Sequence, residues 1–131
     1  MSGSRFVLDS FALLALLQKE RGWERVKGLL NDAELGRVEL HMSIINLAEV
    51  HYLTLRRGTN VSQTLAAIEA LPIKIASADE YVPGVVELKA QYPIALADCF
   101  AAALAIDLDC PLVTSDPEFR KLEKILTVEW L

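Results

Sequence analysis

The acidic residue with the clearest chemical implication is Asp98, because it stands alone in an apolar segment. Ile94 to Ile106 reads IALADCFAAALAI, in which twelve of the thirteen residues are apolar. A helix this apolar is buried on most of its surface, and an ionised carboxylate there costs free energy unless a cation or hydrogen-bond donors meet it. No Lys, Arg or His lies within one helical turn of Asp98. Asp98 is therefore a candidate ligand or catalytic group.

A structural role for Asp98 is the alternative. Pro93 is a suitable residue for a helix start, and a helix that begins near Ala95 has Asp98 in its first turn. A negative charge in that turn interacts favourably with the helix dipole. The sequence around Asp98 leaves both roles open, so the other acidic residues decide between them.

Three further carboxylates occupy comparable places. Asp9 lies between the apolar run RFVL and the helical run FALLALL, and Asp116 follows the apolar run LVT. Glu49 has apolar neighbours three and four residues away, which places it on an apolar side of its helix. Each has an alternative role, since Asp9 and Asp116 are suitable helix caps and a surface glutamate is usually solvated.

Short apolar runs alternate with helical segments along the chain. The predicted strands are Arg5–Leu8, Val38–His41, Ile73–Ile75, Leu112–Thr114 and Ile125–Val128. Between them we expect helices over FALLALL, Trp23–Ala33, Ser43–Arg57, Asn60–Ala70, Val85–Gln91 and the Asp98 segment. This alternation predicts an α/β fold, a three-layer sandwich in which a short parallel sheet carries helices on both faces. We expect one domain over residues 1–131.

The predicted fold gathers these acidic residues on one side of the sheet. Sites in parallel sheets form outside the carboxyl ends of the strands, and Asp9 and Asp116 each follow a strand directly. Four carboxylates without matching buried cations indicate a divalent metal. Oxygen ligands without His or Cys favour Mg²⁺ or Mn²⁺ over zinc. The corresponding chemistry is metal-assisted hydrolysis of a phosphodiester.

Composition limits the classes of partner. The 131 residues carry 13 basic and 18 acidic side chains, a net charge of −5. An acidic protein is not an obvious nucleic-acid binder by electrostatics, so binding to RNA needs cations or a local basic patch. No apolar run approaches a membrane span and no convincing signal peptide opens the chain. We therefore expect a cytoplasmic protein without a membrane partner.

Four segments in order resemble the PIN-domain family and, within it, the VapC-type ribonuclease toxins. They are FVLDS, SIINLAEV, LADCFAAALA and LVTSDPEF. The resemblance covers nearly the whole chain and implies a Mg²⁺- or Mn²⁺-dependent endoribonuclease. It also implies a homodimer and a cognate antitoxin that occludes the site. Cys99 is a mild departure, because the family often has Ala or Thr there.

The resemblance and the residue chemistry together assign roles. The resemblance implies a catalytic cluster of Asp9, Glu49, Asp98 and Asp116. We expect the three aspartates to hold one or two metal ions, with Glu49 as a further ligand or the group that positions the attacking water. Hydrogen bonds that orient these groups are expected from Ser10, Asn46, Thr114 and Ser115. Arg56 and Arg57 are candidates for contacting the RNA backbone, although basic residues at a helix C-terminus are favourable in any case.

Three other functions compete with this interpretation. A phospho-acceptor receiver domain needs an adjacent acidic pair after the first strand and a Lys after the last, but Ser10 follows Asp9 and no Lys follows Val128. A haloacid-dehalogenase-like phosphatase needs a second Asp where Phe11 stands. A catalytically silent PIN-like module for protein binding is the remaining alternative, and the intact acidic quartet argues against it.

Overall fold

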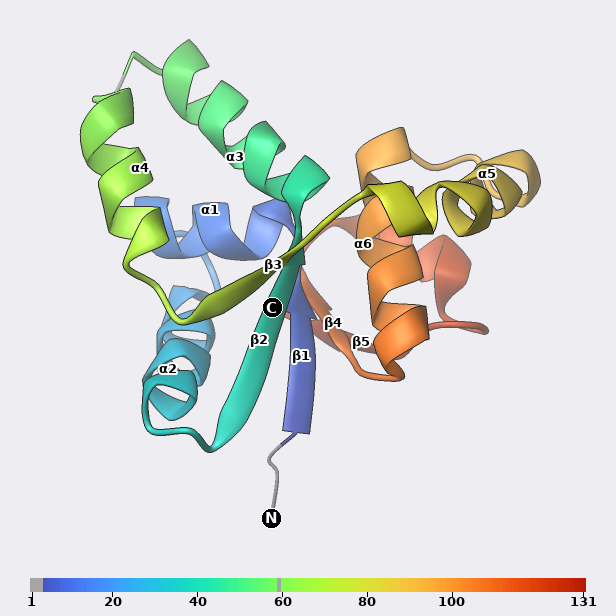
Figure 1. The fold of residues 1–131 in the computed structure, drawn as a ribbon, viewed down its shortest axis with the longest axis horizontal. Helices are drawn as coiled ribbons and strands as arrows, with labels where there is room; N and C mark the ends of the chain where they lie inside the picture. The colour runs from blue at the N-terminus through green and yellow to red at the C-terminus, as the bar shows by residue number, and fades with distance from the viewer. Residues whose placement is uncertain (1–3, 59) are drawn as a thin grey trace.

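Five parallel strands form the centre of the molecule, in the order β3-β2-β1-β4-β5 (Figure 1). The computed structural model describes residues 4–58 and 60–131. Its strands are β1 (Ser4–Leu8), β2 (Val38–Ser43), β3 (Ile73–Ala76), β4 (Leu112–Thr114) and β5 (Val128–Trp130). The predicted parallel α/β fold is confirmed.

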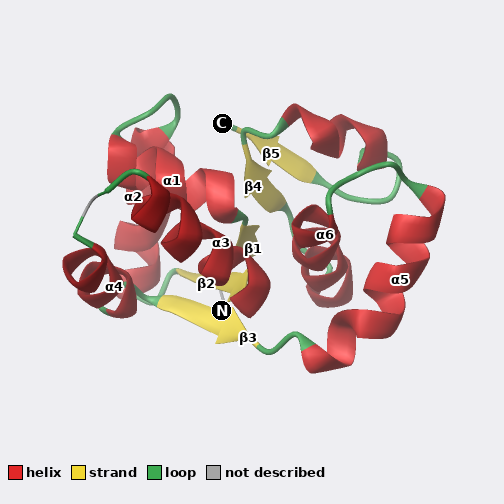
Figure 2. Cartoon of the chain, turned by 90° about the horizontal axis from the view of Figure 1, so that it is seen from above, coloured by secondary structure: helices red, strands yellow, loops and turns green. Residues whose placement is uncertain are grey.

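Helices cover both faces of this sheet (Figure 2). They are α1 (Ser10–Gln18), α2 (Trp23–Glu34), α3 (Ile44–Arg56), α4 (Val61–Glu69), α5 (Val82–Gln91) and α6 (Leu96–Leu108), with two 3-10 helices, η1 (Asp79–Tyr81) and η2 (Pro117–Leu122). Helices α1, α2 and α4 lie on one side of the sheet, and α5 and α6 lie on the other. Helix α3 packs against α1, α4 and α6. The three-layer prediction is thus confirmed.

Within residues 4–58 and 60–131, no single helix is both long and apolar enough to cross a bilayer. One sharply bent pair of segments, Asp79–Gln91 and Leu96–Leu108, is long and apolar enough when its two parts are taken together, by length and composition alone.

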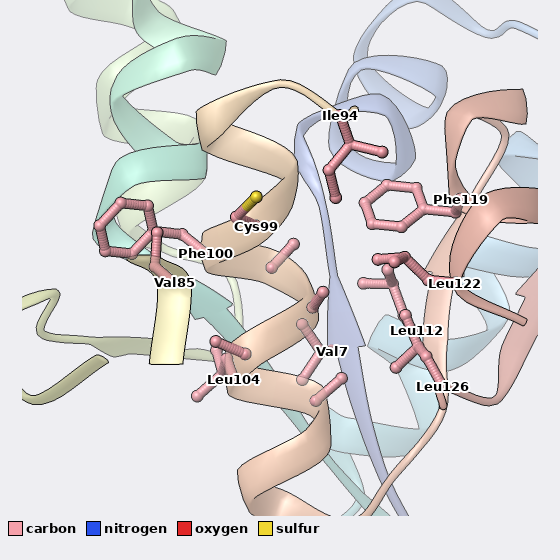
Figure 3. Close-up of a cluster of buried hydrophobic side chains, with 14 residues drawn as sticks. Val7, Val85, Ile94, Cys99, Phe100, Leu104, Leu112, Phe119, Leu122 and Leu126 are labelled. Atoms are coloured by element: carbon pink, nitrogen blue, oxygen red, sulfur yellow. The ribbon is translucent and has the colours of Figure 1, made fainter. Parts of the chain in front are cut away.

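Side chains of the central strands point alternately to the two faces of the sheet, and they pack into two hydrophobic cores. In β1, Val7 faces the core beneath α6 and Leu8 faces the core beneath α1 and α2. Figure 3 shows the first core, which includes Val7 from β1, Leu104 from α6 and Phe119 from η2. Successive strand residues point to opposite faces, so a strand buried on both sides must be apolar throughout. This explains why the sequence shows short apolar runs instead of alternating strands.

The strand order places the ends of β1 and β4 side by side. The chain moves outward from β1 to β2 and β3, then returns through α6 to β4 on the other side of β1. Leu8 is paired with Val113, so the residues that follow both strands emerge together. A reversal of this kind leaves a crevice at the carboxyl ends of the strands. The fold therefore brings Asp9 and Asp116 to the same edge.

The last strand differs from the prediction. Ile125–Val128 was expected to be extended, but β5 covers Val128–Trp130. The amide of Ile125 donates to the Leu122 carbonyl at 2.9 Å, which closes a turn after η2. Leu126 is buried from within this connection, so its apolar character reflects core packing and not a strand. Pairing with β4 begins only at Val128, opposite Leu112.

Gly22 marks a close approach between α2 and the end of β5. Its φ is +89°, and a Cβ there would lie 2.6 Å from Cβ of Leu131. Gly22→Ala should therefore lower the free energy of unfolding by about 2 kcal/mol or more, through left-handed strain and overpacking. Gly28→Ala, inside α2 with nothing within 4 Å of its Cβ, is the matched control. It should raise stability by roughly 0.5–1 kcal/mol. Denaturant unfolding measures both, and a Gly22→Ala variant as stable as wild type would contradict the packing described.

Candidate active site

Asp9 is the most completely enclosed of the four predicted carboxylates. It is 0% exposed, directly after β1. Its Oδ1 accepts from the Ala12 amide at 2.9 Å and so caps α1, while its Oδ2 accepts from the Thr114 hydroxyl. Thr114 lies at the end of β4, so this bond joins the carboxyl ends of the two central strands. Asp9 is thus a helix cap and a member of the acidic cluster at once.

Asp116 is buried two residues beyond Thr114. Its amide donates to the Thr114 hydroxyl oxygen at 2.9 Å. Its Oδ1 accepts from the Glu118 amide at 3.0 Å and caps η2. The predicted cap is therefore present, and it orients the Asp116 side chain at the strand edge beside Asp9.

Glu49 and Asp98 approach from two helices. Glu49, half-buried on α3, has its Oε1 bound by the Ser10 hydroxyl. Asp98 is 6% exposed in the first turn of α6, a helix without a side-chain cap at its N-terminus. A hydrogen bond links the Asp98 and Asp116 side chains. All four carboxylates therefore belong to one cluster in which each is held by a neighbour.

Burial and mutual repulsion control the protonation of the cluster. Burial raises the pKa of Asp9 to about 7 from the ordinary 3.8, against the hydrogen bonds from Thr114 and Ala12 that favour its ionised form. Burial also raises the pKa of Asp98 to about 8, with further increases from the charges of Asp116, Asp9 and Glu49 and from the hydrogen bond to Asp116. No ion pair among the described residues includes any of the four carboxylates. With pKa values raised to about 7 and 8, Asp9 and Asp98 hold protons at neutral pH, which lowers the repulsion within the cluster.

The donor set suits a hard divalent cation in its chemistry. Carboxylate oxygens without imidazole or thiolate are the ligands of Mg²⁺ and Mn²⁺, and Oδ1 of buried Asn46 is an additional oxygen without a partner. Within the described part of the chain, no three acidic, His or Cys side chains already form a metal-binding group. Both oxygens of Asp9 are engaged, and Asp98 is bonded to Asp116. Metal binding would therefore have to displace a proton.

The structure brings some of the predicted supporting residues into the cluster and leaves others outside. Ser10 and Thr114 bind carboxylates directly, and Asn46 joins α3 to α6. Ser115 is exposed, whereas Thr114 before it and Asp116 after it are buried. Arg56 and Arg57 are exposed at the carboxyl end of α3, where Arg56 lies over the Tyr52 ring at 5.7 Å. No ion pair among the described residues joins either arginine to the four carboxylates.

The sequence did not predict that a backbone carbonyl would bind one of the supporting side chains. The Ala97 carbonyl accepts from Nδ2 of Asn46 at 3.2 Å, next to Asp98 in the first turn of α6. A backbone carbonyl carries no signal in side-chain type, so only the arrangement of α3 against α6 identifies it.

Comparison with known proteins places this geometry in context. The family model described as PIN domain matches residues 6–125. No curated protein sequence matches the chain significantly. Among solved structures, the chain is similar to VapBC2 from Rickettsia felis bound to a DNA fragment from its promoter, with a TM-score of 0.72 and 18% identity over 97% of this chain and 98% of that one. It is also similar to VapBC-1 from nontypeable Haemophilus influenzae, with a TM-score of 0.70 and 26% identity over 96% and 97% of the two chains. A toxin–antitoxin complex from Klebsiella pneumoniae is similar as well, with a TM-score of 0.69 and 20% identity over 94% of each chain.

The raised pKa values predict a pH dependence of stability in metal-free protein. Unfolded aspartates ionise near 3.8, whereas native Asp9 and Asp98 keep their protons to about 7 and 8. The native state therefore binds more protons than the unfolded state between about pH 4 and pH 8. The stability that these two aspartates contribute is complete below pH 4 and is lost as the pH rises through 7 to 8. In EDTA, the melting temperature should fall by several degrees over this range.

Substitution identifies the source of this pH dependence. Asp98→Asn should remove a large part of the fall in melting temperature, because the amide does not titrate. Glu87→Gln, at an exposed carboxylate on α5, should leave the fall unchanged. A wild-type slope in Asp98→Asn would show that the cluster does not hold the protons assigned to it.

Proposed function

Because this chain belongs to the PIN-domain family, we propose that it is a Mg²⁺- or Mn²⁺-dependent endoribonuclease and the toxin of a VapBC-type toxin–antitoxin pair. The observation that carries the proposal is the convergence of Asp9, Glu49, Asp98 and Asp116 at one sheet edge without a neutralising cation among the described residues. Such a cluster is costly as a purely structural feature. It is well suited to binding a divalent cation and phosphate together.

In the proposed mechanism, Asp9, Asp98 and Asp116 hold the cation. When bound, the metal lowers the pKa of water to supply hydroxide at neutral pH and stabilises charge on the phosphoryl oxygens. Thr114 holds Oδ2 of Asp9, which fixes that carboxylate between the strand ends. Asp98, whose pKa is raised to about 8, must release its proton before it can hold a cation, so metal affinity should rise with pH.

Glu49 is the group proposed to orient the attacking water. Its Oε1 is occupied by the Ser10 hydroxyl, which leaves Oε2 to accept from water. Attack in line with the bridging oxygen breaks the P–O3′ bond and leaves a 5′-phosphate and a 3′-hydroxyl. The proton of the attacking water passes to solvent through Glu49, and the leaving 3′-oxygen takes one from solvent.

The proposal includes an RNA substrate, an antitoxin, a homodimer and a cytoplasmic location. The R. felis and H. influenzae structures are of VapBC complexes, which supports an antitoxin partner for a chain of this fold. An antitoxin segment carrying Arg or Lys would satisfy the same carboxylates as the cation. Metal and antitoxin should then weaken each other's binding by linkage. Arg56 and Arg57 remain candidates for contacting the RNA backbone.

Activity with purified protein tests the enzymatic proposal. With Mn²⁺ or Mg²⁺ the protein should cut single-stranded or looped RNA, and EDTA should stop it. Asp9→Asn, Asp98→Asn and Asp116→Asn should each lower kcat by about 100-fold or more, because each removes a charge that holds the cation. Glu87→Gln is the control and should retain full activity. Wild-type cleavage that is equally fast in EDTA would overturn the metal-dependent mechanism.

Co-expression tests the assignment as a toxin. The small open reading frame adjacent to this gene should encode a protein that co-purifies with the chain and protects cells from it. The purified complex should bind Mn²⁺ more weakly than the free chain, as a titration of melting temperature would show. If nothing co-purifies and the chain alone is harmless in cells, the toxin assignment fails while the PIN fold stands.

A further inference from the structure

Asn46 has a contact pattern that packing alone does not explain. The side chain is 0% exposed in the first turn of α3. Its Nδ2 donates to the Ala97 carbonyl at 3.2 Å, across 51 residues of sequence. Its Oδ1 is buried and has no hydrogen-bond partner. A buried polar acceptor without a partner typically costs about 1–3 kcal/mol, so an apolar side chain of similar size would suit a merely structural position better.

Asn46 lies close in sequence to Glu49, and the residue that it binds precedes Asp98. Asn46 and Glu49 are three residues apart on α3, so their side chains lie on neighbouring positions of one helical face. The carbonyl that Asn46 binds belongs to Ala97, the residue before Asp98. Helix α6 has no side-chain cap at its N-terminus. The amide of Asn46 therefore joins the helix that carries Glu49 to the uncapped turn that carries Asp98.

The unused oxygen suggests a second role for the same amide. Because the amide group is planar, the bond from Nδ2 to Ala97 also fixes the direction of Oδ1. Mg²⁺ usually keeps several of its waters, and these waters donate to acceptors around the site. A buried acceptor one helical turn from Glu49, on a side chain bound to the residue before Asp98, is suited to receive such a bond.

We propose that Asn46 is a positioning residue of the acidic site, whose Nδ2 holds the start of α6 and whose Oδ1 accepts a hydrogen bond from a water of the bound cation. This inference rests on the proposed metal-dependent function. It assigns to Asn46 a part in metal affinity that is separate from any part in folding.

The test compares three variants by Mn²⁺ titration of the melting temperature. Asn46→Leu should stay close to wild type in stability without metal, because removal of the unpaired acceptor offsets loss of the bond to the Ala97 carbonyl. The Mn²⁺ concentration for half of the maximal shift should rise about 10–100-fold. Asn46→Asp keeps an oxygen at Oδ1 but loses the donor to the Ala97 carbonyl, so it should recover only part of the affinity lost in Asn46→Leu. Gln18→Leu is the matched control, because Oε1 of Gln18 is also buried without a partner but lies at the end of α1. It should bind Mn²⁺ like wild type.

RNA cleavage at low and high Mn²⁺ gives the second measurement. The kcat of Asn46→Leu should fall at low Mn²⁺ and recover at high Mn²⁺, with KM for RNA unchanged. The inference is overturned if Asn46→Leu binds Mn²⁺ as tightly as wild type, or if Asn46→Asp binds no better than Asn46→Leu. Should Asn46→Leu fail to fold, Asn46→Ala is measured against the same criteria.

The two proposals fail in different ways. If wild type binds Mn²⁺ but cuts no RNA, the ribonuclease proposal fails, and the titrations still decide the role of Asn46. If wild type is not stabilised by Mn²⁺, the assignment of Asn46 falls, and cleavage in EDTA then decides whether the chain is a nuclease of another kind.

Discussion

Repulsion among buried carboxylates is the constraint on which the rest of this structure depends. Asp9 and Asp98 are enclosed by apolar helices and strands, and no described cation pairs with them. Hydrogen bonds from Thr114 and the Ala12 amide stabilise the charge on Asp9, whereas burial and the neighbouring carboxylates raise the pKa of Asp98 to about 8. The two hydrophobic cores supply the free energy that keeps these groups together. Packing in these cores therefore offsets the repulsion among the buried carboxylates.

Structural and chemical roles coincide at the sheet edge. Asp9 caps α1 and Asp116 caps η2, yet both belong to the acidic cluster. A cap fixes one carboxylate oxygen by a backbone amide and so limits the side chain to few orientations. The entropy cost of ordering these carboxylates is therefore met when the chain folds. The alternative roles considered for these aspartates are not exclusive, since capping is the means by which the chain orients them.

The supporting hydrogen bonds connect elements that are distant in sequence. Ser10 reaches Glu49 across 39 residues, and Thr114 reaches Asp9 across 105. Each bond joins a residue on a central strand end, or the helix start beside it, to a carboxylate on another element. The relative placement of α1, α3, β1 and β4 is thereby coupled to the geometry of the site. A change in packing between these elements would alter the acidic cluster even if every carboxylate remained.

The sequence by itself determined the secondary elements and the four carboxylates, because both depend on local patterns. Short apolar runs, helical spacing and capping residues such as Asn60, whose Oδ1 accepts from the Gln63 amide at 3.1 Å, act within a few residues. The tertiary structure alone decided which side chains meet. In the folded chain Asn46 binds the Ala97 carbonyl, and Ser115 is exposed. Arg56 and Arg57 lie at the carboxyl end of α3, and β5 begins at Val128. These outcomes depend on how α3, α6 and β4 pack together, and packing across tens of residues leaves no periodic signal in the chain.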